Sequence, residues 1–275
     1  MTFRVLGMLE VGLDDRTYSP TGGKIRQLLA LFLCRANEVV SPEALMEELW
    51  GDAPPRSAMV TLQSHVYQLR RALDRAFPEA GLGRALVTRS RGYMFSVPEG
   101  RVDALEFERL VLQARRLAER GRPTEALEAS RAARNLWRGE VLSDVQRGPL
   151  LNAHAVRLAE LRLTAIRACV AADMDLFRYG ELVPQLRTLV AYYPFDEWFH
   201  VQLIRALAGD GRRGDALLSY DHVCRLLDEE LGLEPSAELR RLRAEILSGD
   251  VRRFRGRPAR DGSERSPSPD GVHAS

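Results

Sequence analysis

The clearest periodic pattern of apolar residues lies between Ala58 and Ala76. At 100° per residue, one set of side chains gathers within about 80° of arc, which predicts an amphipathic helix with one buried face. The apolar set is Met59, Leu62, Val66, Leu69 and Leu73. The opposite face carries hydroxyl, amide and guanidinium groups with no carboxylate near its centre: Thr61, Ser64, Tyr67, Gln68, Arg71 and Arg75. Such a face can bind base edges and phosphates, but an ordinary solvated surface has the same pattern.

Two weaker patterns open the chain. Residues 3–11 alternate loosely between apolar and polar side chains and are followed by turn residues, which predicts a strand, a turn and a return strand. Residues 24–36 are apolar on most sides, which predicts a helix inside the core.

A second helix and a long loop come directly before the amphipathic helix. Ser41 followed by Pro42 is typical of a helix start, and we expect that helix to end near Trp50. Two prolines in residues 51–57 then hold the chain extended. This loop is longer than the turn of a simple helix-turn-helix, and it ends at Ser57, the expected N-cap of the amphipathic helix.

A hairpin is predicted after the amphipathic helix. Residues 85–88 and 93–97 predict two strands, and Arg89-Ser90-Arg91-Gly92 between them predicts a tight turn with two arginines. A hairpin placed directly after a helix with a basic face is typical of a wing. Arginine at its tip is suited to a DNA minor groove, where the negative potential is strongest. The alternative is an ordinary charged hairpin tip.

The chain changes character at Val102 and predicts helix after helix as far as Leu247. The expected helices are 104–120, 123–137, 149–172, 175–192, 196–208, 212–231 and 236–247, separated mainly by glycine and proline. Two junctions resemble each other, Gly121-Arg122-x-x-Glu125-Ala126-Leu127 and Gly211-Arg212-x-x-Asp215-Ala216-Leu217. Stacked helix pairs need a glycine turn followed by a small residue, so a TPR-like array of helical repeats is expected.

The patterns together predict the domain organisation. Residues 1–98 are expected to form an α+β winged helix-turn-helix domain, and residues 102–247 an all-α helical repeat domain. Residues 250–275 contain mostly arginine, glycine, proline and serine, and we expect them to be disordered.

Charge supports a nucleic-acid partner only locally. The formal net charge of the 275 residues is +2, which by itself identifies no partner. Residues 56–91 hold seven arginines against two acids, Asp74 and Glu79, and this segment alone carries +5. No run of 18 apolar residues occurs, so we expect no membrane segment and a cytoplasmic, nucleoid-associated protein.

The residues that usually carry catalysis or bind metals form no known arrangement. Cys34, Cys169 and Cys224 are far apart and are expected to be buried free thiols. The five histidines lack metal-ligand spacing, and the Gly22-Gly23-Lys24 segment lacks one glycine and the hydroxyl of a phosphate-binding loop. We therefore expect no enzyme activity and no cofactor.

Several short motifs in one order resemble the Streptomyces antibiotic regulatory protein family. The N-terminal part is similar to the OmpR/PhoB-type winged helix, through Gly23-Lys24-x-Arg26-x-Leu28-Leu29, Leu62-x-x-x-Val66-x-x-Leu69-Arg70-Arg71-x-Leu73 and Arg89-Ser90-Arg91-Gly92-Tyr93. The helical part resembles the bacterial transcriptional activation domain of these regulators, through Val102-Asp103-Ala104-x-x-Phe107, Leu136-Trp137-Arg138-Gly139 and Gly232-Leu233-Glu234-Pro235-Ser236. The resemblance covers about residues 1–247. The matched motifs include no receiver domain with a phosphoacceptor, so we expect no regulation by phosphorylation through such a domain.

The resemblance implies a transcriptional activator of antibiotic or other secondary-metabolite genes. Such a protein binds direct repeats in double-stranded promoter DNA as a homodimer or side-by-side pair, and it recruits RNA polymerase holoenzyme. The residues expected at the DNA are Lys24, Thr61, Ser64, His65, Tyr67, Gln68, Arg70, Arg71, Arg75, Arg89 and Arg91. The residues expected to face polymerase are Trp50, Asp52, Pro54, Pro55 and Arg56.

Two other functions fit the same sequence. The helical array is also suited to binding a protein or peptide as an adaptor, and the same winged fold also serves repressors. Sequence-selective DNA binding separates the first from an activator, and transcription with purified polymerase separates the second.

Overall fold

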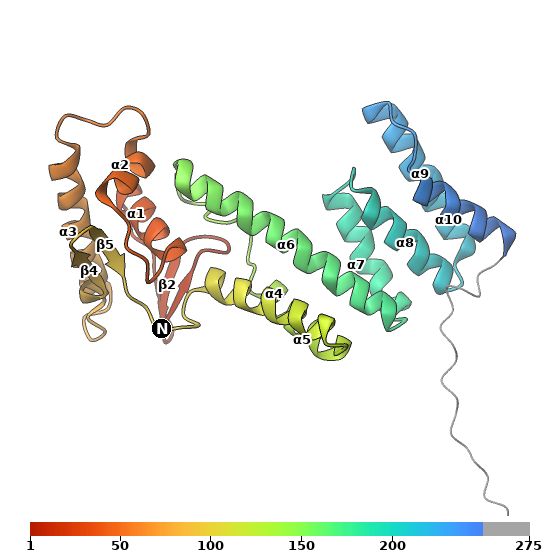
Figure 1. Ribbon diagram of the computed structural model, residues 1–275, viewed down its shortest axis with the longest axis horizontal. Coiled ribbons are helices and arrows are strands. Elements are labelled where there is room, and N and C mark those ends of the chain that lie inside the picture. The colour runs from red at the N-terminus through yellow and green to blue at the C-terminus, as the bar shows by residue number, and fades with distance from the viewer. Residues whose placement is uncertain (250–275) are drawn as a thin grey trace, which may run out of the picture. The chain divides into compact units, whose positions relative to one another are not determined.

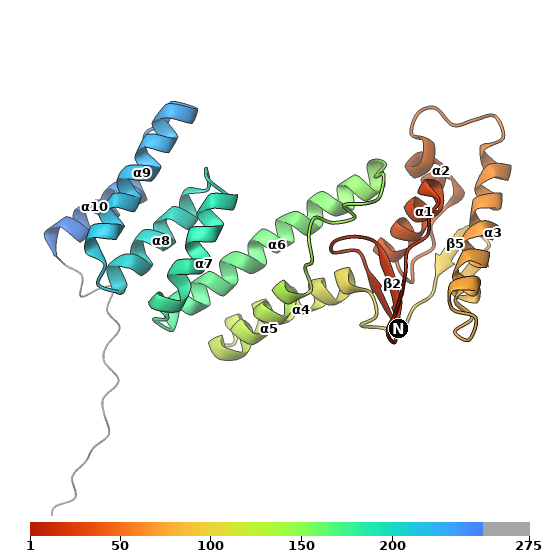
Figure 2. The same cartoon turned by 180° about the vertical axis from the view of Figure 1, so that it is seen from behind.

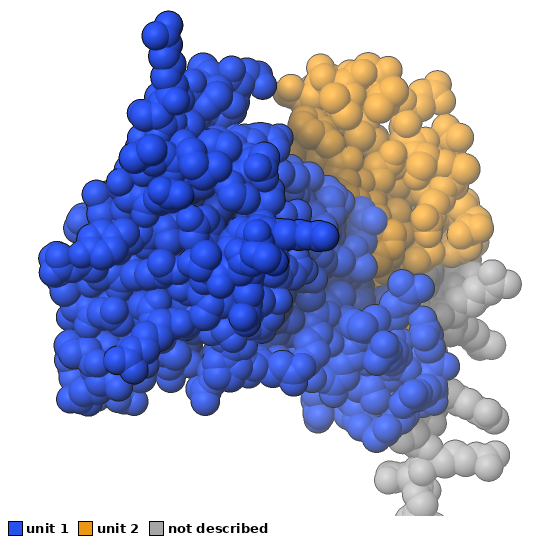
Figure 3. Space-filling view, turned by 60° about the vertical axis from the view of Figure 1, so that its left-hand side comes forward, with its two compact units in different colours: residues 1–172 blue, residues 173–275 orange. Residues whose placement is uncertain are grey.

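The structure is a computed structural model, and it describes residues 1–249. The expected disordered tail, 250–275, lies outside the described residues. Two compact units are distinguished, the first comprising residues 1–172 and the second beginning at Asp173 (Figure 3).

A three-stranded antiparallel sheet opens the first unit. Its strands are β1 (Thr2–Arg4), β2 (Glu10–Leu13) and β3 (Arg16–Tyr18), in the order β1-β2-β3. The expected turn and return strand are confirmed by the pairing of β2 with β3, but the single strand expected over residues 3–11 is wrong, because β1 and β2 are separate strands with Phe3 opposite Val11. The chain reverses at Gly7, whose φ of +147° is favoured only for glycine. Val5, Leu6 and Leu9 in this turn are all buried, which a strict alternation does not predict.

Three helices follow: α1 (Gly23–Cys34), α2 (Pro42–Trp50) and α3 (Ala58–Ala76) (Figure 1). The expected start of α2 is confirmed, because the Ser41 hydroxyl accepts a hydrogen bond from the Ala44 nitrogen at 3.2 Å. Ser57 stands at the N-cap of α3, but its side chain makes no capping hydrogen bond. Its hydroxyl lies instead 3.4 Å from that of Thr61, so Ser57 occupies the expected N-cap position without capping the helix through its side chain.

The buried face of α3 differs from the expected one at its first turn. Leu62, Val66, Leu69 and Leu73 are buried as expected, but Met59 is 41% exposed and Ala58 is only 7% exposed. Ala58 and Met59 stand at opposite edges of the arc formed by Leu62, Val66, Leu69 and Leu73, each about 50° from its centre. The helical period alone therefore does not decide which of these two residues is buried.

The expected hairpin is present, with strands β4 (Leu86–Arg89) and β5 (Gly92–Phe95) after a short 3-10 helix η1 (Leu82–Ala85). Only Ser90 and Arg91 stand between the strands, since Arg89 pairs with Gly92. The hairpin is joined to the link between α1 and α2: Val40 and Tyr93 exchange backbone hydrogen bonds of 2.8 and 3.0 Å.

The helical part has seven helices in the described residues. They are α4 (Asp103–Glu119), α5 (Pro123–Asn135), α6 (Pro149–Asp175), α7 (Tyr179–Tyr192), α8 (Glu197–Gly209), α9 (Arg213–Leu231) and α10 (Ala237–Ser248). Their bounds lie within a few residues of those expected. In the second unit, α8 packs against α7, α9 and α10, and most of its residues are buried (Figures 1 and 2).

The two similar junctions of the sequence have similar structures. Gly121 and Gly211 both have positive φ, at +69° and +83°. In each junction the following arginine forms an ion pair three residues ahead, Arg122 with Glu125 and Arg212 with Asp215. The backbone nitrogen of each arginine also bonds the carbonyl five residues earlier, at 3.0 and 2.8 Å. The junctions therefore behave as one repeated turn between paired helices.

One hydrophobic core extends across the expected domain boundary near residue 100. The buried residues of the winged part continue without interruption into Phe107 of α4 and Leu151, Leu158 and Ala165 of α6. Each large apolar side chain buried in this way contributes about 1.5 to 3 kcal/mol. The winged part is consequently fused to the first helices rather than tethered to them.

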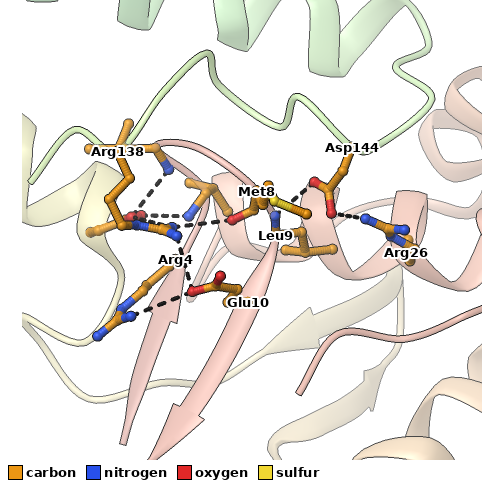
Figure 4. Close-up of polar contacts among 10 residues, drawn as sticks. Arg4, Met8, Leu9, Glu10, Arg26, Arg138 and Asp144 are labelled. Carbon is orange, nitrogen blue, oxygen red and sulfur yellow. Dashed lines mark hydrogen bonds and ion pairs between the residues drawn. The ribbon is translucent and has the colours of Figure 1, made fainter. Parts of the chain in front are cut away.

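Half-buried acidic side chains reinforce this junction. Asp144 accepts a hydrogen bond from the Leu9 nitrogen at 2.8 Å and forms an ion pair with Arg26, and Arg138 donates to Glu10 at 3.0 Å and to the Met8 carbonyl at 3.1 Å (Figure 4).

Asp103 at the start of α4 accepts from the nitrogens of Val5 and Leu6 at 2.8 and 3.1 Å. The turn after β1 thus has its backbone donors satisfied by the helical part.

The three cysteines are free, as expected. Cys34 and Cys169 are buried and Cys224 is half-buried. Burial raises the pKa of the Cys34 thiol to about 12, so this residue is an unreactive core group.

Candidate nucleic-acid interface

The exposed face of α3 carries most of the residues expected at DNA. Ser64, Tyr67, Gln68, Arg71 and Arg75 are exposed, and Thr61 is half-buried. The Ser64 hydroxyl donates to the Val60 carbonyl at 3.0 Å, which leaves its oxygen able to accept. The guanidinium carbon of Arg71 lies 5.9 Å from the centre of the Tyr67 ring, a cation-π distance. The structure therefore brings this set together on one surface.

Val60 belongs to the same face, although it is not among the residues predicted from the sequence to contact DNA. Its side chain is 65% exposed. It stands four residues before Ser64 and seven before Tyr67, and this spacing puts all three on one side of a helix. The helical period places residue 60 on this face, but an apolar side chain by itself does not indicate DNA binding.

His65 is on the flank of α3 and contacts the end of α2. Its ring is stacked on that of Trp50, with centroids 6.4 Å apart and planes 28° apart. Its Nδ1 is buried and has no hydrogen-bond partner in the described part of the chain. The expected polymerase-facing Trp50 and the expected DNA-facing His65 are thus in direct contact.

Two expected phosphate ligands are already engaged within the protein. The Lys24 amine donates to the Leu49 carbonyl at the end of α2 and to Gln27 at 3.3 Å. Arg70 donates from Nε to the Leu86 carbonyl and from Nη2 to the Thr88 hydroxyl, both at 2.9 Å. These side chains differ from Arg71 and Arg75, which are exposed.

The hairpin presents its tip to solvent. Arg89, Ser90 and Arg91 are all exposed. Gly92 beside them is buried with a φ of +145°, and a Cβ at this position would lie 2.0 Å from the Val40 carbonyl oxygen. The tip arginines are therefore displayed on a turn whose base is fixed against the body of the winged part.

The loop between α2 and α3 lies at the N-terminal end of α3, whereas β4 and β5 lie beside its C-terminal half (Figures 1 and 2). Every residue from Gly51 to Ser57 is exposed. The loop is nevertheless ordered by backbone bonds, from Ala53 to the Trp50 carbonyl at 3.3 Å and from Ala58 to the Pro55 carbonyl at 2.9 Å. It therefore presents Asp52, Pro54, Pro55 and Arg56 without covering the polar face of α3.

Two classes of site have no representative in residues 1–249. The described histidine, cysteine and acidic side chains form no group of three or more that is suited to a metal ion. None of the described helices combines the length and apolar character needed to cross a membrane.

Two family models match the chain. Residues 20–95 match the family model described as transcriptional regulatory protein, C terminal, and residues 102–247 match the bacterial transcriptional activator domain.

Two curated relatives cover most of the chain. The chain is 37% identical over 253 residues to the regulatory protein DnrI of Streptomyces peucetius, covering 91% of this chain and 93% of that protein. It is 36% identical over 247 residues to the transcriptional regulator RedD of Streptomyces coelicolor, covering 90% of this chain and 70% of that one.

A solved structure has the same fold over most of the chain. It is that of Mycobacterium tuberculosis EmbR in complex with a low affinity phosphopeptide. It is similar with a TM-score of 0.79 at 29% identity, over 90% of this chain and 65% of that one.

Proposed function

Since the chain belongs to the Streptomyces antibiotic regulatory protein family, we propose that α3 binds the major groove of promoter DNA while the β4–β5 hairpin reaches the adjacent minor groove. A member of this family is a DNA-binding transcriptional activator of antibiotic or other secondary-metabolite genes. The observation that carries the proposed contacts is the exposed polar face of α3 on the same body as the exposed arginines of the hairpin tip.

Base reading falls to the uncharged side chains of α3. Gln68 is exposed and can pair with the two major-groove groups of adenine, and Ser64 and Thr61 are suited to thymine or phosphate. Each good base contact supplies about 1 to 3 kcal/mol of discrimination. Tyr67 and His65 flank this set and complete the proposed contact surface.

Phosphate binding falls to the cations. Arg71, Arg75, Arg89 and Arg91 are exposed, and Lys24 joins them if its amine leaves the end of α2. With about five phosphates neutralised per protomer, the logarithm of the binding constant falls with that of salt at a slope near −4 to −5.

The loop from Trp50 to Arg56 is the proposed contact with RNA polymerase holoenzyme. Its exposure and its distance from the hairpin support this role, because polymerase and DNA then bind different parts of the winged fold. Two protomers on direct repeats, acting on the nucleoid in the cytoplasm, complete the proposal. It includes no catalytic step and no cofactor.

A mobility-shift titration against genomic fragments tests the DNA interface. Gln68→Ala is expected to weaken binding at the selected site by about 5- to 150-fold and to change nonspecific binding little. Arg89→Ala is expected to weaken both and to reduce the salt slope by about one. Gln146→Ala, an exposed glutamine outside α3 and the hairpin, is the matched control and should bind normally. A protein that shows no sequence-selective shift acts through protein contacts instead.

A further inference from the structure

The side chain of Arg70 joins α3 to the first strand of the hairpin. It stands on the helix one position before the exposed Arg71, but it is itself only half-exposed. Its fork makes two hydrogen bonds of 2.9 Å, one to the Leu86 carbonyl and one to the Thr88 hydroxyl. Arginine is suited to this because its donors are fixed in one plane and reach two acceptors together.

The strand register explains why a backbone carbonyl of β4 is available to accept a hydrogen bond from Arg70. Arg89 and Gly92 flank a two-residue turn and form a bonded pair, so bonded and non-bonded pairs alternate from there. Thr88–Tyr93 and Leu86–Phe95 are therefore non-bonded pairs, whose backbone groups point away from the hairpin.

On the β5 side, those outward groups are satisfied by the α1–α2 link. Tyr93 bonds Val40, and the Phe95 carbonyl accepts from the Asn37 nitrogen at 2.9 Å. On the β4 side, the outward carbonyl of Leu86 is satisfied by Arg70. The hairpin is thus held on both edges, and Arg70 is what holds the edge that faces α3.

A second contact links α3 to η1, the short helix that leads into β4. Asp74, one turn after Arg70, accepts a hydrogen bond from the Gly83 nitrogen at 2.8 Å, just before β4. This contact fixes the approach to the strand, whereas Arg70 fixes the strand itself near the tip. The orientation of Arg89 relative to the exposed face of α3 consequently depends on Arg70.

We propose that Arg70 is a positioning residue, which acts on DNA by setting the angle of the hairpin relative to α3 rather than by binding phosphate itself. This rests on the proposed function of α3 and the hairpin. It separates Arg70 from Arg71 and Arg75, which share its charge and its helix but are exposed.

A double-mutant cycle in DNA binding tests the proposal. Arg89→Ala alone and Arg70→Ala alone are each expected to weaken binding about tenfold, and the double variant is expected to bind like Arg70→Ala alone. Arg75→Ala is the matched control, and with Arg89→Ala it is expected to give about a hundredfold loss because independent contacts add. Arg70→Lys keeps the charge but loses the fork, so it is expected to resemble Arg70→Ala. Additive losses for residues 70 and 89, or full binding by Arg70→Lys, would overturn the proposal.

Hydrogen exchange of the free, full chain gives a readout that needs no DNA. Arg70→Ala is expected to speed exchange of the hairpin amides, residues 86–95, by about tenfold relative to wild type and Arg75→Ala. Thr88→Val is expected to reproduce part of this change, and Thr88→Ser, which restores the hydroxyl, to reverse it. Circular dichroism checks that each variant is folded. If Arg70→Ala does not fold, Thr88→Val and Thr88→Ser test the proposal instead. Unchanged exchange contradicts the positioning role. A wild type without selective DNA binding contradicts the proposed function alone.

Discussion

The carboxylate of Glu48 in α2 accepts a hydrogen bond from the backbone nitrogen of Leu151 in α6, 3.0 Å away and 103 residues further along the chain. The same carboxylate accepts from the nitrogens of Gly148 and Leu150 at 2.6 and 2.9 Å. Glu48 is 1% exposed, so a buried negative charge caps the start of α6, where unpaired N–H groups gather. The helix that leads into the α2–α3 loop is thereby fixed to the helical part.

Removing this carboxylate should destabilise the first unit. Glu48→Ala leaves the amides of Gly148, Leu150 and Leu151 at the start of α6 without their acceptor, whereas Gln27 keeps its hydrogen bond to the backbone carbonyl of residue 48. Each buried unsatisfied group costs about 1 to 3 kcal/mol, so we expect a loss of at least about 3 kcal/mol in the free energy of unfolding. Urea unfolding of the full chain measures it. Glu47→Ala, at the exposed neighbouring position, should stay within about 0.5 kcal/mol of wild type.

Asp103 should make stability depend on pH in the acid range. Burial raises the pKa of its carboxyl above the usual 3.8, and the hydrogen bonds from Val5 and Leu6 and the charge of Arg138 oppose this only in part. The folded protein therefore takes up the proton at a higher pH than the unfolded chain. Because of this group, the free energy of unfolding increases as the pH falls from above the folded-state pKa toward 3.8.

The difference in unfolding free energy between wild type and Asp103→Asn isolates this effect. It should increase in favour of wild type as the pH falls from 7 toward about 4, measured by urea unfolding. Arg138→Gln removes the charge that lowers the pKa of Asp103, so it should move this window to higher pH. A difference that stays constant, or changes in the other direction, would mean that the Asp103 pKa is not raised.

Gly92 should tolerate no side chain. Its φ of +145° disfavours other residues, and a Cβ would lie 2.0 Å from the Val40 carbonyl oxygen. Gly92→Ala must therefore displace the hairpin from the α1–α2 link, and we expect a loss of more than about 2 kcal/mol in thermal unfolding. Gly214→Ala is the contrasting variant: this glycine is in the first turn of α9 with open space around it, so alanine should stabilise by about 0.5 to 1 kcal/mol.

Local patterns in the sequence predicted most of the secondary structure. Ser41 followed by Pro42 fixed the start of α2, and the arginine-tipped turn fixed the hairpin, because the responsible contacts are only a few residues apart. The positive φ at Gly121 and Gly211 belongs to the same class, since a helix has to end where the chain turns left-handed.

Long-range contacts were not predictable in this way. Asp103 bonds Val5 and Glu48 bonds Leu151, across 98 and 103 residues, and no local pattern marks either carboxylate as buried. For the same reason a continuous core between the winged and helical parts was not expected. Within the site, the role of Arg70 could not be predicted from the sequence, because its position in the helix is the same whether it binds phosphate or a neighbouring strand.

The α2–α3 loop should affect transcription without affecting DNA occupancy. Trp50 is unsuitable for this test because its ring is stacked on His65, so replacing it also disturbs α3. Pro54, Pro55 and Arg56 are exposed and lie at the end of α3 away from the hairpin. Replacing all three with alanine should reduce stimulation by purified RNA polymerase at least about fivefold, the effect of losing one strong interface contact.

Footprinting on the same template supplies the control for this experiment. Occupancy of the promoter site should equal that of wild type, because the polar face of α3 and the hairpin arginines are unchanged. Pro98→Ala, at another exposed proline just after the hairpin, should leave both stimulation and occupancy unchanged. If the triple variant stimulates normally at equal occupancy, polymerase is contacted elsewhere. If occupancy falls with stimulation, the loop contributes to DNA binding and the division of the winged fold into two contact surfaces is wrong.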